Sequence, residues 1–123
     1  MKQLRVLVVE DEMTIALLLE DMLDNLGHKV VALALRFGQA VKLATDAQIG
    51  VAILDVNLNG QISFPVAELL EARGVPFVFA TGYGSAGVDT SYRGRGMVIK
   101  KPFDFKDLRG AIERVAAEAR PVA

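Results

Sequence analysis

The chain has no cysteine among its 123 residues, which excludes a disulfide framework, a thiolate metal site and a cysteine nucleophile, and suits the cytosol. It also lacks an excess of charge, because 14 Lys and Arg stand against 15 Asp and Glu and leave a net charge of -1. Nucleic acid and membrane surfaces are therefore not expected partners. The first apolar run, residues 4–9, is too short to span a bilayer and is followed at once by acids. That pattern is unlike a signal peptide, and we expect a cytoplasmic protein.

What the chain does have is enough apolar sequence for a core, since 52% of residues are hydrophobic and 24% are charged. Its length fits one domain, which we expect over residues 1–119, followed by a frayed tail at 120–123. Short runs rich in Val, Ile and Leu alternate with segments of helical period. These runs cover residues 4–9, 29–34, 51–55, 76–80 and 96–99. The alternation predicts an α/β fold, a doubly wound parallel five-stranded sheet with helices on both faces.

Residue types that favour helix ends mark several boundaries. Gly27 and Gly74 stand where C-cap glycines belong, and Ser63 opens the helix that Gly74 closes. Asp104 and Asp107 resemble a capping box at the start of the last helix. These signals predict where the helices begin and end between the strands.

Polar side chains follow four of the five predicted strands. Glu10 and Asp11 come after the first strand and Asp55 ends the third. Thr81 follows the fourth strand and Lys101 the fifth. The carboxyl ends of parallel strands share one edge of the sheet, so we expect these groups to converge there. Three carboxylates that repel one another favour a hard divalent cation, and a site with oxygen ligands only indicates Mg²⁺ or Mn²⁺ rather than zinc.

A cation, a lysine and a hydroxyl around a carboxylate are the groups that phosphoryl transfer requires. An aspartate that attacks phosphorus needs no general base, so no catalytic histidine is required. The single histidine, His28, lies away from this edge and is expected to be a surface residue. Phe105 is expected to belong to the core.

The ordered set of motifs at these strand ends resembles the receiver domain of two-component response regulators. The resemblance covers essentially the whole chain. The motifs are Val8-Val9-Glu10-Asp11-Glu12, Ile53-Leu54-Asp55-Val56-Asn57, Thr81 and Lys101-Pro102-Phe103. The stretch Pro76-Phe77-Val78-Phe79-Ala80-Thr81-Gly82-Tyr83-Gly84 is similar to the signature of the FATGUY single-domain receivers of alphaproteobacteria.

The resemblance implies a flavodoxin-like (βα)₅ fold with strand order 2-1-3-4-5. It further implies that Asp55 accepts a phosphoryl group from a phosphohistidine on a histidine kinase or histidine phosphotransfer protein. The phosphoryl group would contact Thr81 and Lys101. Mg²⁺ or Mn²⁺ would be held by Asp11 and Asp55 carboxylates, the Asn57 backbone carbonyl and, through water, Glu10. A cis peptide bond before Pro102 would help to aim Lys101.

The chain departs from the family pattern at the position of the switch residue. Val98 stands in place of the usual aromatic switch residue. Five of the eleven glycines lie between the fourth and fifth strands, which predicts a weak helix near 88–93 within a mobile segment at 82–95. We therefore expect Thr81 and Tyr83 to transmit a change to the surface of the fourth helix, fifth strand and fifth helix. The downstream partner is unknown. We expect a single-domain regulator without an attached output domain, and the FATGUY resemblance suggests a stress response.

Other interpretations of the same residues were weighed. Each acid alone fits a turn or a helix N-terminus. A flavodoxin-like FMN carrier shares the architecture, but Glu10, Asp11 and Glu12 would repel the flavin phosphate. A haloacid-dehalogenase-type phosphatase would need a second aspartate where Asn57 stands. A receiver-like interaction module that takes no phosphate is disfavoured by the intact acidic and lysine set.

Overall fold

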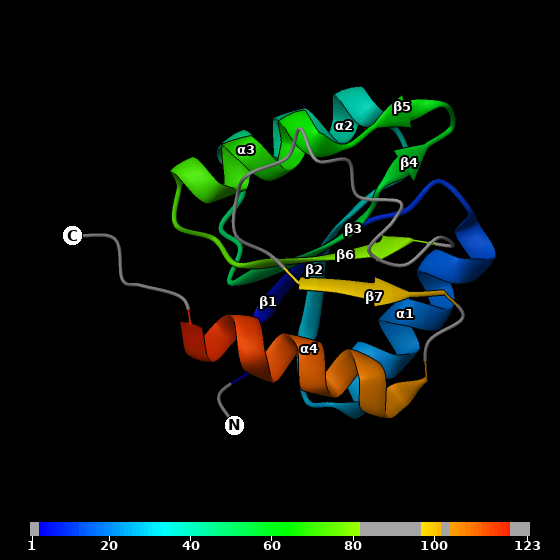
Figure 1. The fold of residues 1–123 in the computed structure, drawn as a ribbon, viewed down its shortest axis with the longest axis vertical. Helices are drawn as coiled ribbons and strands as arrows, with labels where there is room; N and C mark the ends of the chain where they lie inside the picture. The colour runs from blue at the N-terminus through cyan, green and yellow to red at the C-terminus, as the bar shows by residue number, and fades with distance from the viewer. Residues whose placement is uncertain (1–2, 82–96, 102–103, 119–123) are drawn as a thin grey trace.

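The computed structural model describes residues 3–81, 97–101 and 104–118. Its centre is a five-stranded parallel sheet in the order β2-β1-β3-β6-β7 (Figure 1). The strands are β1 (Arg5–Val9), β2 (Lys29–Ala34), β3 (Val51–Asp55), β6 (Phe77–Thr81) and β7 (Met97–Lys100). The helices are α1 (Met13–Asn25), α2 (Phe37–Asp46), α3 (Phe64–Ala72) and α4 (Phe105–Glu118). Counting the strands of this sheet alone, the order is 2-1-3-4-5, so the expected doubly wound α/β fold is confirmed.

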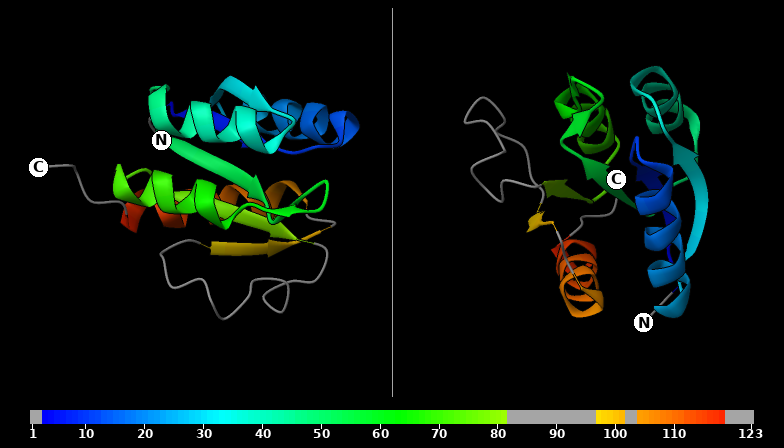
Figure 2. Two further views of the ribbon diagram at one scale, coloured as in Figure 1. Left: turned by 90° about the horizontal axis from the view of Figure 1, so that it is seen from above. Right: turned by 90° about the vertical axis from the view of Figure 1, so that its right-hand side faces the viewer.

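Helices cover both faces of the sheet, α2 and α3 on one side and α1 and α4 on the other (Figures 1 and 2). Side chains of β1 alternate between the two layers: Leu7 and Val9 pack toward α2 and α3, and Val6 and Val8 toward α1 and α4. All four are buried. This explains why the strand is continuously apolar, since a parallel strand with both faces covered has no solvent side.

A small antiparallel hairpin after β3 was not predicted. It pairs β4 (Asn57–Leu58) with β5 (Gln61–Ile62). Its turn residues Asn59 and Gly60 have φ of 50° and 93°, as a tight hairpin turn requires. The Asn-Gly dipeptide is a strong hairpin signal in a sequence, but the strands it joins are too short to show an alternating pattern.

The predicted helix boundaries mostly hold. Gly27 and Gly74 follow helix ends with φ of 86° and 72°. Asp104 and Asp107 form a reciprocal capping box, with backbone N–H to carboxylate distances of 2.9 and 3.1 Å. Ser63 is the N-cap of α3, but its hydroxyl makes no capping bond; it is buried without a hydrogen-bond partner among the described residues.

Two expectations about single residues are wrong. His28 is not a surface residue: it is 3% exposed, and its Nδ1 accepts a hydrogen bond from the Leu4 N–H at 3.1 Å. The burial arises from pairing between segments 24 residues apart, which no local pattern shows. Phe105 is 36% exposed rather than part of the core, because it lies at the first position of α4.

Several predictions fall outside the described residues and stay predictions. These are the weak helix near 88–93, the switch segment 82–95 with Tyr83, the bond before Pro102 and the tail at 120–123. Among the helices that the structure does describe, none is both long and apolar enough to cross a membrane.

Candidate functional site

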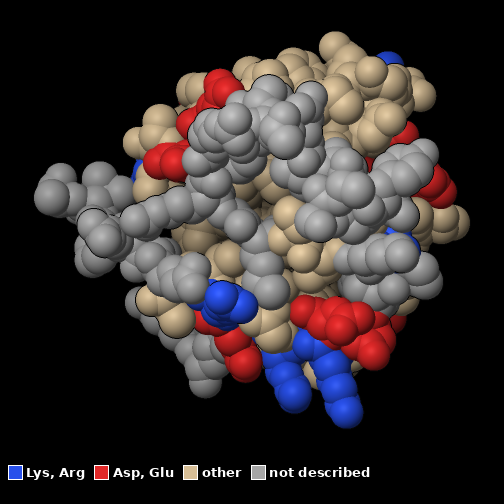
Figure 3. Space-filling view, viewed as in Figure 1, with Lys and Arg blue, Asp and Glu red and all other residues tan. Residues whose placement is uncertain are grey.

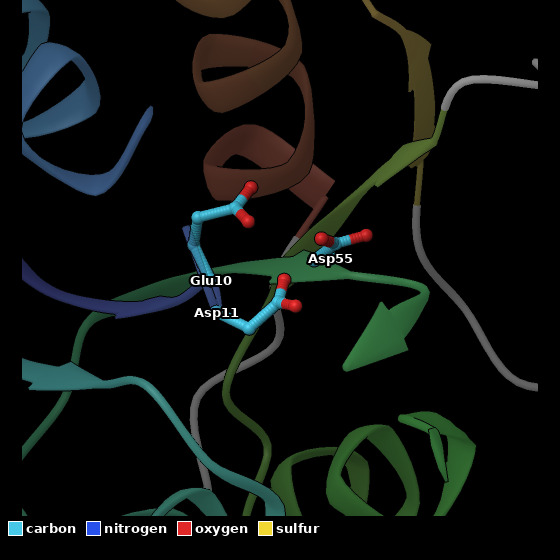
Figure 4. A group of neighbouring side chains, drawn as sticks. All are labelled: Glu10, Asp11 and Asp55. Carbon is cyan, nitrogen blue, oxygen red and sulfur yellow. The ribbon is translucent and has the colours of Figure 1, made fainter. Parts of the chain in front are cut away.

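The carboxyl edge of the sheet brings together acids from two neighbouring strands. Val9 of β1 is level with Leu54 of β3, so the next residues, Glu10 and Asp55, leave the sheet side by side. One carboxylate oxygen from each of Glu10, Asp11 and Asp55 lies within 4.8 Å of the others, and Figure 4 shows the three side chains at these strand ends. The convergence predicted for these acids is therefore present.

Lys101 follows the edge strand β7, and its ammonium group contacts this cluster. Its Nζ lies 2.8 Å from Glu10 Oε1 and 3.2 Å from Asp55 Oδ2. The Lys101 backbone N–H donates to the Thr81 carbonyl at 2.8 Å, which fixes the chain as it leaves β7 beside β6. One ammonium group thus serves two carboxylates that are 45 residues apart in sequence, residues 10 and 55.

Glu10 is the most deeply placed acid of the cluster. It is 1% exposed, and this burial, with the nearby charge of Asp55, raises its pKa to about 7 despite hydrogen bonds from Lys101 and the Glu12 N–H. Burial alone would lower the pKa of Lys101. The hydrogen bond to Glu10 and the charge of Asp55 outweigh that burial, so the pKa of Lys101 is raised and the ammonium stays charged.

Thr81 and Val98, the predicted switch residues within the described chain, lie on adjacent strands. Thr81 ends β6 and is 4% exposed. Val98 pairs with Phe79 and packs, partly buried, against the core layer of α2 and α3. Thr81 thus ends the strand next to β3, and Val98 lies on the edge strand β7.

Asn57 is held by the unpredicted hairpin. Its Oδ1 accepts a hydrogen bond from the Gly60 N–H at 2.8 Å, and its own N–H donates to Asp55 Oδ1 at 3.2 Å. The side chain of Asn57 is thus used within the turn. The hairpin shapes the loop next to Asp55, and the Asn59-Gly60 dipeptide is the sequence signal that identifies it.

The donor set fits a hard divalent cation. The clustered ligands are carboxylate oxygens, the type that Mg²⁺ and Mn²⁺ prefer. Asp11 and Asp55 are half-buried and Glu10 is buried, so the cluster is reachable from solvent on one side. The single ammonium of Lys101 leaves the three acids with excess negative charge, which a cation would neutralise.

Among the described residues, five large hydrophobic side chains are exposed. They belong to elements that follow the site residues in sequence: α1 after the first two acids, the hairpin after Asp55, and α4 after Lys101. They are Met13, Leu17, Leu18, Ile62 and Phe105. On the face shown in Figure 3, acidic and basic side chains adjoin on the lower part of the molecule.

Comparison with known proteins gives a consistent result. The family model of the response regulator receiver domain matches residues 6–113. The solved structure of SdrG from Sphingomonas melonis Fr1 is 42% identical with a TM-score of 0.81, covering 94% of this chain and 98% of that one. The PhyR stress response regulator is 27% identical with a TM-score of 0.83, covering 98% and 48%.

A curated relative is likewise matched over only part of its length. The phyllosphere-induced regulator PhyR of Methylorubrum extorquens is 30% identical over 112 residues, which cover 89% of this chain and 42% of the relative. The chain therefore spans less than half of the length of PhyR.

Proposed function

Because the chain belongs to the response regulator receiver domain family, we propose that it accepts a phosphoryl group on Asp55 from a phosphohistidine donor. One observation carries the proposal: Asp55 ends the central strand β3 inside an acid cluster, with the Lys101 ammonium 3.2 Å from its Oδ2. A nucleophile, a counter-charge and a metal-type donor set are thus found at one place. The three exposed acids of α1, Glu20, Asp21 and Asp24, have no such surroundings.

In the proposed reaction, a carboxylate oxygen of Asp55 attacks phosphorus as the bond from phosphorus to the imidazole nitrogen breaks. An O–P bond forms, the N–P bond is lost, and the imidazole leaves with the electron pair and takes up a proton. Lys101 balances the charge on the phosphoryl oxygens, and the Thr81 hydroxyl donates a hydrogen bond to one of them. No base is needed, because the carboxylate attacks as an anion.

Asp11 and Asp55 would hold Mg²⁺ or Mn²⁺ through carboxylates, with the backbone carbonyl of Asn57 and, through water, Glu10. The engagement of the Asn57 side chain by Gly60 supports the use of its backbone. When bound, the metal supplies positive charge to the transferring group.

The proposed donor is a histidine kinase or a histidine phosphotransfer protein in the cytoplasm. The exposed hydrophobic side chains on α1, the hairpin and α4, the elements that follow the site residues, support a protein donor, because exposed apolar surface favours protein contacts. With a kinase that phosphorylates the wild type, Leu18→Ser should slow transfer by about tenfold, which is the cost of losing roughly one buried apolar side chain. Transfer from acetyl phosphate should be unchanged. Equal slowing with both donors would contradict docking of the kinase on these exposed hydrophobic side chains.

The proposed output is a change in the surface formed by β7, α4 and the segment before β7, in which Thr81 is the link to the phosphoryl group and Tyr83 the moving ring. The valine at position 98 supports a route other than an aromatic at that position, since a β-branched side chain on a strand is stiff. The resemblance to the PhyR stress response regulator supports a role in stress signalling. Amide exchange over 82–95, with and without beryllofluoride and Mg²⁺, tests this route; unchanged exchange at saturation would contradict it.

Intact mass after incubation with acetyl phosphate and Mg²⁺ tests the phosphoacceptor. The wild type and Asp24→Asn should each gain one phosphoryl group, and Asp55→Asn should gain none. Stoichiometric phosphorylation of Asp55→Asn would show that another residue is the acceptor. A wild type that gains nothing would favour an interaction module that takes no phosphate.

A further inference from the structure

The three clustered acids are engaged in different ways. Both oxygens of Glu10 accept hydrogen bonds: Oε1 from Lys101 Nζ at 2.8 Å and Oε2 from the Glu12 N–H at 3.1 Å. Asp55 also contacts Lys101, but at 3.2 Å. Glu10 is thus the nearer partner of the lysine and the most buried of the three acids.

The length of Glu10 matters to this contact. An aspartate at position 10 would be shorter by one methylene, or about 1.5 Å of reach. From the same backbone position, its carboxylate would lie farther from Lys101 Nζ, so the lysine would have to shift to keep the contact. The glutamate therefore sets where the ammonium lies as well as its charge partner.

We infer that Glu10 is a positioning residue for Lys101: its carboxylate is the nearer partner of the ammonium and holds it 3.2 Å from Asp55 Oδ2. This inference rests on the proposed phosphotransfer and gives Glu10 a role that does not pass through the metal. Lys101 is a long and flexible side chain, and a second carboxylate partner fixes where its ammonium lies. Held between Glu10 and Asp55, the ammonium is in place to balance the charge of a phosphoryl group on Asp55.

Four variants separate this role from metal binding. Glu10→Gln removes the charge at constant shape, and Glu10→Asp keeps the charge but shortens the reach. Glu12→Gln is the matched control, because it removes an exposed charge two residues away. Lys101→Met provides a background in which Glu10 has no lysine to position. Each protein is checked for folding by circular dichroism.

Phosphorylation by acetyl phosphate at saturating Mg²⁺ should fall by about tenfold or more in both Glu10 variants, since small misplacements of a catalytic group are costly. Glu12→Gln should match the wild type. In the Lys101→Met background, Glu10→Gln should cause no further loss. A wild-type rate in Glu10→Asp, or an undiminished effect of Glu10→Gln beside Lys101→Met, would overturn the inference.

Two measurements need no phosphodonor. By titration calorimetry, Glu10→Gln should change the Mg²⁺ affinity far less than Asp11→Asn, which should weaken it by about tenfold or more, as loss of a metal-site group does. The change in unfolding midpoint caused by Glu10→Gln should differ between the two backgrounds, with Glu10→Gln relatively more stabilising beside Lys101→Met, because there the buried carboxylate has lost its ammonium partner. Equal losses of Mg²⁺ affinity in the two variants would assign Glu10 to the metal and overturn the inference. Failure of the proposed function would instead appear as a wild type that gains no phosphoryl group.

Discussion

The two edges of the sheet are built in opposite ways. At the carboxyl edge, three acids cluster, and two of them, Glu10 and Asp55, contact the ammonium of Lys101. At the amino edge, backbone groups pair directly: the Lys29 N–H donates to Leu4 at 3.0 Å and the Gly50 N–H to Arg5 at 2.7 Å. His28 completes this closure by accepting from the Leu4 N–H. The difference is that one edge holds unbalanced negative charge, while the other is closed by backbone hydrogen bonds and one buried imidazole.

Each edge nevertheless contains one buried titratable side chain, and burial acts on both in the same sense. It raises the pKa of Glu10 and lowers the pKa of His28, because in both cases the neutral form is favoured away from water. The contributions of Glu10 and His28 to the stability of the folded protein therefore change with pH in opposite directions.

The largest expected effect lies at the carboxyl edge. Asp11→Asn should weaken Mg²⁺ binding by about 10- to 100-fold, whereas without metal its free energy of unfolding should be unchanged or raised, since one repelling charge is removed. Titration calorimetry and urea unfolding measure the two quantities. Asp21→Asn, on the exposed face of α1, is the control. A marked loss of stability in metal-free Asp11→Asn would remove the contrast between the edges.

The amino edge should show the reverse. His28→Leu leaves the Leu4 N–H without its acceptor and should lower the free energy of unfolding by about 1–3 kcal/mol. Phosphorylation by acetyl phosphate should be unaffected at a temperature where the variant is folded. His28→Gln retains an acceptor and should cost less. A phosphorylation defect in folded His28→Leu would show that the two edges are coupled.

The pH dependence of stability sharpens the comparison. The pKa of His28 is lowered from its ordinary value of 6.5, so its contribution is complete above pH 6.5 and is lost as pH falls through the folded pKa. The pKa of Glu10 is raised from 4.5 to about 7, so its contribution is complete below pH 4.5 and is lost as pH rises through 7.

Urea unfolding of the metal-free protein from pH 4 to 8 measures both contributions. The stability of the wild type minus that of His28→Gln should fall toward acid, and the same difference for Glu10→Gln should fall toward neutral pH. Taking the difference between wild type and variant cancels the contributions of the titratable groups that both proteins contain. If the two stability differences changed with pH in the same direction, the opposite pH responses assigned to His28 and Glu10 would be wrong.

The smallest effect concerns two glycines. Gly110 lies on the exposed side of α4, and an added Cβ would meet nothing within 4 Å, so Gly110→Ala should stabilise the protein by about 0.5–1 kcal/mol. Gly50 lies at the closed amino edge, where an added Cβ would lie 3.4 Å from Arg5 N and from Leu4 Cδ2. Gly50→Ala should gain less. A gain as large as that of Gly110→Ala would show that the amino edge is less tightly packed than its backbone pairing indicates.

Much of the fold could be predicted, because parallel strands covered on both faces leave continuous apolar runs. Lys29–Ala34 and Val51–Asp55 have the expected bounds. The first strand begins one residue later than predicted, and β6 and β7 are shifted by one residue at both ends. The site residues could be located because each follows a strand. The contact of Lys101 with Glu10 could not be predicted, since it joins residues 91 positions apart and depends on side-chain length.

The burial of His28 escaped prediction for a related reason. A single polar residue beside a C-cap glycine looks exposed in any local pattern. Only the pairing of β1 with β2 brings the Leu4 N–H to its ring. Local periodicity therefore identifies elements and strand ends, while the partners of individual polar groups depend on the assembled sheet.

The order of the strands also has a consequence for synthesis on the ribosome. β1, β2 and β3 are neighbours in the sheet and belong to the first 55 residues, so all three acids of the cluster emerge early. Their lysine follows 46 residues after Asp55. The nascent chain thus makes its like charges first and their counter-charge last, and the docking of β7 is the step at which Lys101 offsets part of the negative charge that the first 55 residues bring together.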